Sequence, residues 1–237
     1  MKQPIGIIGA MEMEVQAILS AMEEKSEQET AGMVFYSGLL GGVPCVAAQC
    51  GPGKVSAAAC AQAMILNFSP RLLINVGVAG GIGQGVNIGD LVIASACVQY
   101  DMDTSVLGDR LGAVSLRRTG KTEMVVEFPC DSAASRLLAG EAEVIYGHAH
   151  SGVVATGDTF VADGEKSRAI GAQFSAKAVE MEGGSIAQVC YMNGVPCAVL
   201  RAISDNADDT GKMDYLEFAR IAADRSARLL CGAVPKL

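Results

Sequence analysis

The sequence of 237 residues contains no tryptophan, only two histidines and no long uninterrupted apolar run. A membrane-spanning helix needs about 20 predominantly apolar residues, so no segment is expected to cross a membrane. The two histidines, His148 and His150, form an HxH pair, but no third ligand stands at a recognisable spacing. We therefore expect loop or surface positions for them and no metal site. Neither histidine lies beside a serine or cysteine motif, so acid and base chemistry falls to carboxylates.

Basic side chains are also scarce. The chain has 18 lysines and arginines against 26 acidic residues, a formal charge of -8, and no Lys/Arg-rich block. This balance argues against a nucleic-acid groove and against a polybasic membrane contact. A small polar or cationic ligand fits it better.

The eight cysteines contain no CxxC pair, and most of them lie inside apolar strand or helix patterns. Such cysteines are typical of reduced core thiols in a cytoplasmic protein, and a disulfide scaffold is not expected at this length. The apolar stretch at the N-terminus is interrupted at Glu12, which is not typical of a secretory signal.

With 50% hydrophobic residues and 28 glycines, the chain is long enough to bury a large core. We expect one α/β domain that covers residues 1–237, because no repeat, low-complexity tract or linker interrupts it. The expected strands cover 5–10, 34–40, 43–50, 72–78, 91–98, 152–155, 177–181 and 195–203, and the expected helices cover 12–24, 54–68, 132–142, 183–193 and 213–231. This alternation predicts a three-layer sandwich, in which a mixed, mainly parallel sheet has helices on both faces.

Glycines cluster at three places. Gly6-Ile7-Ile8-Gly9 lacks the GxGxxG spacing of a dinucleotide site, and Gly51-Pro52-Gly53-Lys54 lacks the full phosphate-loop frame and is interpreted as a turn before a helix. The cluster from Gly77 to Gly83 directly follows a strand, where missing Cβ atoms would let a ligand approach the backbone. A tight turn needed only for packing is the alternative for that cluster.

The segment 99–124 has little periodicity and many charged residues. Such a segment often closes a site or crosses a subunit interface, and a mobile solvated loop is the alternative.

Three apolar segments end in acidic residues. Glu12 and Glu14 follow the first strand, Glu180 and Glu182 follow Val179, and Asp205 follows a strand that also carries Arg201. Ionised groups are costly there unless they meet each other or a polar ligand. Ligands of α/β sheets bind at the carboxyl ends of strands, so one cleft lined with carboxylates is predicted. We expect Glu180 and Glu182, at the end of their strand, to point to opposite faces, so that only one of them faces the cleft.

These motifs in combination resemble the 5'-methylthioadenosine/S-adenosylhomocysteine nucleosidases of the nucleoside phosphorylase family. The resemblance spans almost the entire chain. It is carried by Gly6–Glu14, Asn75–Gly81, Gly157–Val161, Val179–Glu182 and Arg201–Asp205. It implies the phosphorylase-like α/β sandwich and a homodimer in which the partner's irregular loop covers the 5' end of a nucleoside substrate. No cofactor is implied.

The implied reaction is hydrolysis of the bond between adenine and ribose. By resemblance, Asp205 is the general acid at adenine N7, with Ser204 beside it, and Glu14 activates the attacking water. Glu182 accepts hydrogen bonds from the ribose hydroxyls, Met181 packs beneath the sugar, and Arg201 orders the acidic site.

The resemblance also implies how the remainder of the substrate is bound. Phe160 stacks on adenine, the backbone of Val161 reads its Watson-Crick edge, and Gly80 lies near the sugar or base. Tyr215 helps to form the slot for the 5'-thioether.

The chain departs from the family pattern in the same region. Val78 stands where a serine is expected near the acid, Pro52 replaces an aliphatic residue, and Thr104 and Leu107 occupy the partner-loop positions. Catalysis should survive these changes, whereas the rate and the 5' specificity depend on them.

Three other functions compete with this interpretation. A purine nucleoside phosphorylase would need arginines or amides for phosphate, but the first strand ends in acids. A hydrolase of an aminofutalosine-type nucleoside and a purine-binding sensor without turnover are the other two.

Overall fold

The computed structural model describes residues 3–208 and 210–237. One large sheet runs in the order β11-β10-β6-β12-β5-β1-β4-β3-β2, with β9 paired to β6. Its strands are β1 (Ile5–Gly9), β2 (Glu23–Thr30), β3 (Met33–Leu40), β4 (Val43–Gln49), β5 (Leu72–Gly81), β6 (Leu91–Gln99), β9 (Phe128–Pro129), β10 (His150–Thr156), β11 (Ala176–Glu180) and β12 (Cys197–Asp205).

The sheet contains two parallel blocks. Strands β4, β1, β5 and β12 run parallel in one block, and β6, β10 and β11 run parallel in the other. The blocks join through antiparallel pairs on both sides, β12 with β6 and β11 with β5. The strands β5, β12, β6, β10 and β11 therefore form a closed ring, which the alternation of strands and helices did not predict.

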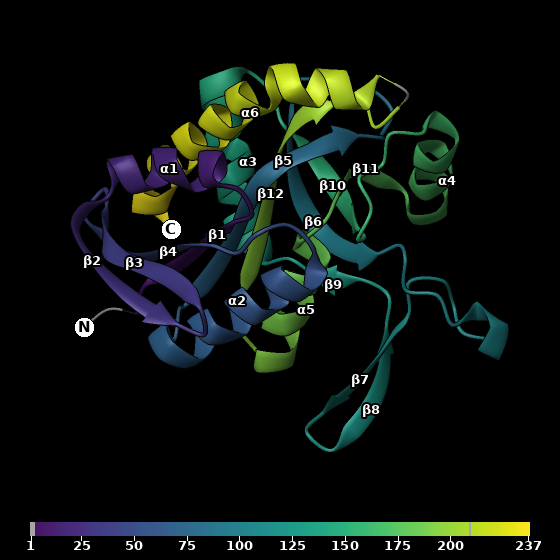
Figure 1. The fold of residues 1–237 in the computed structure, drawn as a ribbon, viewed down its shortest axis with the longest axis horizontal. Coiled ribbons are helices and arrows are strands. Elements are labelled where there is room, and N and C mark those ends of the chain that lie inside the picture. The colour runs from purple at the N-terminus through teal and green to yellow at the C-terminus, as the bar shows by residue number, and fades with distance from the viewer. Residues whose placement is uncertain (1–2, 209) are drawn as a thin grey trace.

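Helices cover both faces, which confirms the predicted three-layer α/β sandwich (Figure 1). The helices are α1 (Glu12–Ala21), α2 (Lys54–Phe68), α3 (Ser132–Tyr146), α4 (Gly164–Phe174), α5 (Gly183–Asn193) and α6 (Gly211–Ala233), with 3-10 turns at Ser105–Leu107 (η1) and Val234–Lys236 (η2). Helices α1, α3 and α6 pack together over one face, and α2 and α5 pack together over the other. Among the described residues, no helix is both long and apolar enough to cross a membrane.

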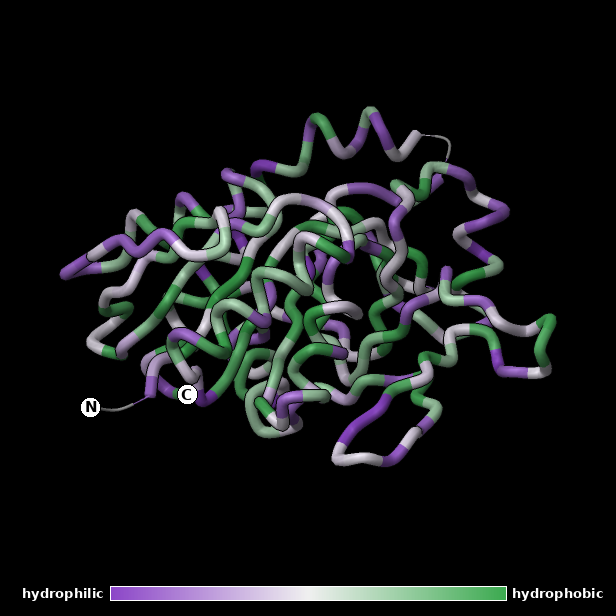
Figure 2. The backbone as a smooth tube through the Cα atoms, turned by 60° about the horizontal axis from the view of Figure 1, so that its bottom comes forward, coloured by the Kyte–Doolittle hydropathy of each residue, from purple (hydrophilic) through white to green (hydrophobic). Residues whose placement is uncertain are grey.

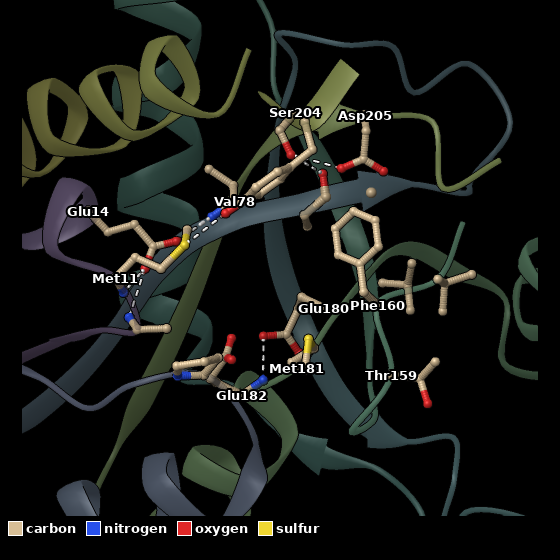
Figure 3. Close-up of a pocket in the computed structure, with 17 residues that line it drawn as sticks. Met11, Glu14, Val78, Thr159, Phe160, Glu180, Met181, Glu182, Ser204 and Asp205 are labelled. Atoms are coloured by element: carbon tan, nitrogen blue, oxygen red, sulfur yellow. Dashed lines mark hydrogen bonds between the residues drawn. The ribbon is translucent and has the colours of Figure 1, made fainter. Parts of the chain in front are cut away.

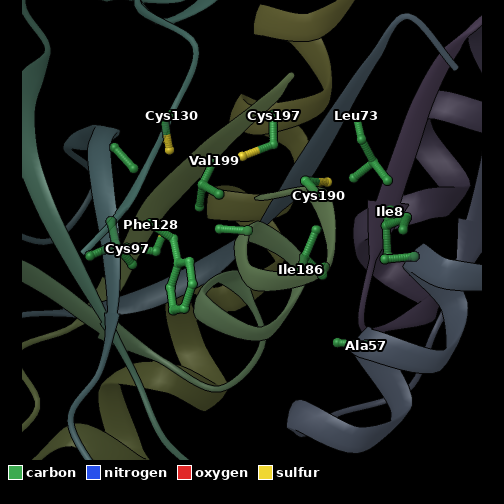
Figure 4. Packing of buried hydrophobic residues seen from close by; sticks show 14 of the residues in the cluster. Ile8, Ala57, Leu73, Cys97, Phe128, Cys130, Ile186, Cys190, Cys197 and Val199 are labelled. Carbon is green, nitrogen blue, oxygen red and sulfur yellow. The ribbon is translucent and has the colours of Figure 1, made fainter. Parts of the chain in front are cut away.

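The core lies on both sides of the sheet because alternate strand residues point to opposite faces. In β5, Leu73 belongs to the hydrophobic cluster under α2 and α5, whereas Leu72 and Ile74 belong to the cluster under α1, α3 and α6. Figure 2 shows the hydrophobic segments concentrated inside the molecule. Cys97, Cys190 and other thiols fill the first cluster beside Phe128 (Figure 4), and all eight cysteines are free.

The first helix is shorter than predicted. It ends at Ala21, and residues 23–30 form the edge strand β2 rather than a helical turn and a loop. This strand has the sequence EEKSEQET and pairs antiparallel with β3. It escapes prediction because it presents no apolar face, and its charges protect an exposed sheet edge from further pairing.

The segment 99–124 is more ordered than predicted. After η1 it forms the hairpin β7 (Val114–Arg118) and β8 (Lys121–Val125), which projects from the body of the protein (Figure 1). Helix α4 was not predicted either, although Asp163 caps its N-terminus by accepting from the amides of Glu165 and Lys166. The helix is mostly polar, so its apolar periodicity is weak.

Candidate active site

A cavity of about 280 Å³ opens where the carboxyl ends of β5, β11 and β12 converge. Gly80 of β5 pairs with Val179 of β11 on one side and with Asp205 of β12 on the other. Figure 3 shows the acidic side chains on opposite walls of this cavity. Its lining consists of Ala10, Met11, Glu14, Pro52, Val78, Ala79, Gly80, Thr159, Phe160, Val161, Val179, Glu180, Met181, Glu182, Ser204, Asp205 and Tyr215.

Glu14 stands on the first turn of α1 and is held by three backbone amides. Its Oε2 accepts from the amides of Ala10 at 2.7 Å and Met11 at 2.8 Å, and its Oε1 accepts from the amide of Val78 at 3.0 Å. Burial raises the pKa of Glu14, although these amides and Arg201 oppose the rise. The site therefore orients a carboxylate that is more basic than an exposed one.

Asp205 ends β12 and is 3% exposed. Its Oδ2 accepts from Ser204 Oγ at 2.9 Å, and its Oδ1 accepts from the amide of Ala207 at 2.9 Å. Burial raises the pKa of Asp205 against the effect of these two hydrogen bonds. A carboxyl group in this setting holds its proton to higher pH than an exposed aspartate.

Glu180 and Glu182 both line the cavity, so the prediction that only one of them faces it is wrong. Strand β11 ends at Glu180, and the chain turns before α5 begins at Gly183. Glu180 Oε2 accepts from the amides of Glu182 at 3.0 Å and Gly183 at 2.7 Å. Residues two positions apart along a strand point to the same face, so the expectation of opposite faces misapplied the alternation, and the turn held by Glu180 keeps both carboxyl groups at the cavity.

A buried arginine compensates these acids. Arg201 is 1% exposed, lies behind the cavity lining and forms an ion pair with Glu180. Its guanidinium also donates to Asn75 Oδ1. Burial, followed by the nearby charge of Glu180, raises the pKa of Glu182 to about 7, so Glu182 is partly protonated near neutral pH.

Most of the glycine cluster, up to Gly81, is part of β5 rather than a loop after it, which corrects the predicted end of this strand at Val78. A Cβ atom on Gly77 would lie 2.8 Å from Glu14 Oε1, and one on Gly80 would lie 2.9 Å from Asp205 Oδ1. Neither glycine has a positive φ. Glycine is required at these two positions because the Glu14 carboxyl group lies against Gly77 and the Asp205 carboxyl group lies against Gly80. Gly80 also lines the cavity.

The apolar wall is formed by aromatic and thioether side chains. The rings of Phe160 and Tyr215 meet edge to face with centroids 5.5 Å apart, and the Tyr215 hydroxyl contacts the sulfur of Met11. Val161 and Met181 complete this wall. Phe160 is 45% exposed, so its ring is available to a flat ligand.

The start of α2 closes the rim beside Pro52. The amide of Gly53 donates to Glu182 Oε1 at 2.8 Å, and the amide of Lys54 donates to Asp158 Oδ1 at 2.8 Å. Lys54 Nζ lies 2.6 Å from Asp101 Oδ1, and the amide of Asp158 donates to Asp101 Oδ2 at 2.9 Å. The motif interpreted as a turn before a helix thus ties the Gly157–Val161 segment to α2.

Several positions singled out in the sequence lie outside this lining, among them Glu12 and, behind it, Arg201. Thr104 and Leu107 lie at the 3-10 turn η1 of the segment 99–124, which we call the projecting segment, and Leu107 is 78% exposed. His148 lies two residues before β10 and His150 opens this strand, with side chains 60% and 24% exposed.

Sequence reasoning missed two buried polar residues behind the acids. Asn75 donates to the carbonyl of Ile8 at 2.9 Å and accepts from Arg201, and Thr156 Oγ1 donates to Glu180 and accepts from the amide of Gly184. Asn75 stands within the otherwise apolar β5, and Thr156 directly follows the apolar run 153–155 at the end of β10, and these are the signals that would have identified them.

Comparison with known proteins places this cavity in context. The family model described as the phosphorylase superfamily matches residues 4–235. A 5'-methylthioadenosine/S-adenosylhomocysteine nucleosidase from Actinobacillus succinogenes is 35% identical over 234 residues, which cover 98% of this chain and 99% of the relative.

Solved structures of such enzymes resemble this chain over nearly its full length. The nucleosidase of the same name from Neisseria meningitidis, in complex with methylthio-immucillin-A, has a TM-score of 0.93 at 32% identity and covers 100% of both chains. A futalosine hydrolase from Helicobacter pylori has a TM-score of 0.91 at 34% identity, covering 99% of this chain and 98% of that one. The chain belongs to the phosphorylase superfamily and, within it, to the family of the 5'-methylthioadenosine/S-adenosylhomocysteine nucleosidases.

Proposed function

We propose that the protein hydrolyses the N-glycosidic bond of 5'-methylthioadenosine and S-adenosylhomocysteine, releasing adenine and the 5-thio-substituted ribose. The single observation that carries this proposal is the placement of Glu14 and Asp205 on the walls of one cavity, whose lining also contains Glu182. The names of the relatives support the same substrates. No cofactor takes part in the proposed reaction.

Asp205 acts as the general acid. Its proton passes to adenine N7, so that the base leaves as neutral adenine when the bond from ribose C1' to N9 breaks. The raised pKa of Asp205 keeps the acid protonated closer to neutral pH. Proton transfer of this kind contributes about 10² to 10⁴ in rate.

Glu14 acts as the base on the opposite side of the sugar. It accepts a proton from the water that attacks C1' of the oxocarbenium-like ribosyl group, as the base carboxylate of an inverting glycosidase does. The amides of Ala10, Met11 and Val78 fix the carboxylate, so little reorganisation is needed when the water binds.

The rest of the lining binds the nucleoside. Glu182 accepts hydrogen bonds from the ribose hydroxyls above Met181, and Phe160 stacks on adenine while the backbone of Val161 pairs with the base edge. Gly80 lies against the sugar or base, and Tyr215 contributes to the slot for the 5' substituent. Arg201 positions the acids through Glu180.

Val78 and Ser204 act on the two carboxyl groups. Ser204 orients Asp205 through its hydroxyl, and the amide of Val78 holds Glu14, although its side chain offers no hydroxyl to the acid. We expect this valine to change the rate rather than the reaction.

The 5' substituent is the open feature of the substrate. The similarity to a futalosine hydrolase favours an aminofutalosine-type nucleoside as the second candidate. A panel of adenosines with different 5' groups separates the two by their kcat/KM values.

The assembly and location belong to the same proposal. We infer a homodimer of single-domain chains spanning residues 1–237, in which the segment with Thr104 and Leu107 covers the partner's cavity. The free thiols, most of them buried, support a cytoplasmic location.

The direct test is release of adenine from methylthioadenosine in phosphate-free buffer. Asp205→Asn and Glu14→Gln should each lower kcat by at least about 100-fold while the fold is retained by circular dichroism. Near-full activity in either variant would refute the assigned roles. Dependence on phosphate would indicate a phosphorylase, and binding of adenine without turnover would indicate a sensor.

A further inference from the structure

Away from the nucleoside cavity, Asp90 joins both histidines in a compact group and supplies the third ligand that the sequence spacing did not reveal. Asp90 immediately precedes β6, and His150 opens β10. These strands pair in parallel with His150 beside Val92, so Asp90 and His148 each lie two residues before this pair. None of the three side chains lines the nucleoside cavity.

The geometry of this group suits a metal ion. His148 Nε2 lies 2.7 Å from Asp90 Oδ1, and His150 Nε2 lies 3.0 Å from Asp90 Oδ2. One potential ligand atom from each residue lies within 4.8 Å of the other two. With bonds of about 2.0–2.2 Å, ligand atoms around a tetrahedral Zn²⁺ are about 3.4 Å apart, so small side-chain rotations suffice.

The backbone holds this group in place. The amide of Asn87 donates to Asp90 Oδ2 at 2.8 Å, and the amide of Asp90 donates to the Asn87 carbonyl at 3.0 Å. The amide of Ile203 in β12 donates to the Asp90 carbonyl at 2.9 Å. The carboxylate is therefore positioned before any ion binds, which lowers the ordering cost of binding.

We propose that Asp90, His148 and His150 form a binding site for a divalent transition-metal ion of the Zn²⁺ type. Two neutral imidazoles and one carboxylate carry a charge of -1 and supply two nitrogens, which favours Zn²⁺ over the oxygen-preferring Mg²⁺ and Ca²⁺. The side chain of His148 is 60% exposed, so water completes the coordination. The ion would join the start of β10 to the start of β6.

Metal binding to the purified, untagged protein tests this site. Titration with Co²⁺ in a non-thiol reductant should give one equivalent per chain, with d-d bands of a nitrogen and oxygen site. Zn²⁺ should displace the Co²⁺. His148→Gln and Asp90→Asn should each weaken binding by at least about tenfold, because each removes one of three ligands.

A matched control comes from another carboxylate. Asp163→Asn keeps the cap of α4 and removes a charge outside this group, so its metal affinity should equal that of the original protein. Circular dichroism spectra should be unchanged in all three variants, which shows that they fold and keeps this test independent of the proposed function. A thiolate charge-transfer band, or equal metal affinity in His148→Gln and the original protein, would overturn the site.

Discussion

The glycines of β5 matter because two carboxyl groups lie against them. A Cβ atom on Gly77 would lie 2.8 Å from Glu14 Oε1 and 3.3 Å from Arg201 Nη1. We expect Gly77→Ala to displace the Glu14 carboxylate and to weaken its hydrogen bond from the amide of Val78. Loss of a hydrogen bond to a charged group costs about 1.5–3 kcal/mol, so kcat should fall by about 10- to 100-fold in steady-state assays of adenine release.

Gly140 provides the control for this substitution. It lies inside α3, and a Cβ atom there would meet no heavy atom within 4 Å. Gly140→Ala should keep full activity and raise the free energy of unfolding by about 0.5–1 kcal/mol. If Gly77→Ala behaves in the same way, the close contact with Glu14 has no catalytic importance.

Glu182 should make the folded protein less stable as pH rises. Burial raises its pKa from 4.5 to about 7. Below 4.5 both folded and unfolded chains carry this proton, and between 4.5 and about 7 only the unfolded chain releases it, so stability falls across this interval. Above about pH 7 the ionised Glu182 lowers the free energy of unfolding by its full amount, about 3 kcal/mol.

Replacement of Glu182 by glutamine tests whether ionisation of Glu182 lowers the stability of the folded protein. The variant keeps a carbonyl oxygen for the amide of Gly53 but cannot ionise. Its gain in unfolding free energy over the original protein should be about 2 kcal/mol larger near pH 8 than near pH 5.5, measured by urea denaturation. A gain that does not change with pH would show that Glu182 ionises freely in the folded state.

The acidic residues that meet in the cavity were predictable, but the residues with which they pair and pack were not. Glu14, Glu182 and Asp205 each follow an apolar segment, and carboxyl ends of strands gather in α/β sheets. Glu180 and Glu182 stand two positions apart, so strand alternation already places them on one face, whereas the ion pair of Glu180 with Arg201 is a contact that no local pattern encodes. Close packing against Gly77 is likewise a contact between distant parts of the chain.

The connection between α2 and the Gly157–Val161 segment should control substrate binding. Asp101 accepts from both Lys54 Nζ and the amide of Asp158, so it fixes the segment that carries Phe160. Asp101→Ala should raise KM for methylthioadenosine by about tenfold, because charge-assisted hydrogen bonds that order the segment are lost. The kcat should stay within about twofold, since neither Glu14 nor Asp205 contacts Asp101.

An ion pair elsewhere distinguishes this effect from a general loss of charge. Lys236 pairs with Glu141 away from the cavity lining. Lys236→Met should leave both kcat and KM unchanged. A normal KM in Asp101→Ala would show that the segment is ordered without this connection.

Elements with an apolar face were predictable, and those without one were not. The helix at Lys54–Phe68 and the β3–β4 hairpin have the predicted bounds within about one residue, because alanine-rich periodicity and the Gly41-Gly42 turn are local signals. Strand β2 and the β7–β8 hairpin are largely polar and owe their structure to pairing with a neighbour. Pairing of this kind is a tertiary effect that overrides local preference.

The closed ring of strands sets the position of the cavity. Alternating strands and helices predict a layered sheet, but they do not specify that β11 returns to pair with β5. This pairing brings the carboxyl ends of two oppositely directed blocks together at Gly80. Its register depends on residues almost 100 positions apart, which explains why the sequence pattern left it open.

Apolar side chains on the projecting segment give the homodimer proposal a specific test. Val106 and Leu107 are adjacent and 93% and 78% exposed, and exposed apolar side chains that lie together mark interaction sites more often than single ones do. The double substitution Val106→Asp and Leu107→Asp should convert the dimer to a monomer in sedimentation velocity. It should also raise KM for methylthioadenosine, because the partner's cover is lost.

Val144 on α3 is 81% exposed, and Val144→Asp is the matched control that should remain dimeric. A dimer that survives the double substitution but dissociates with Val144→Asp would place the interface on α3 instead.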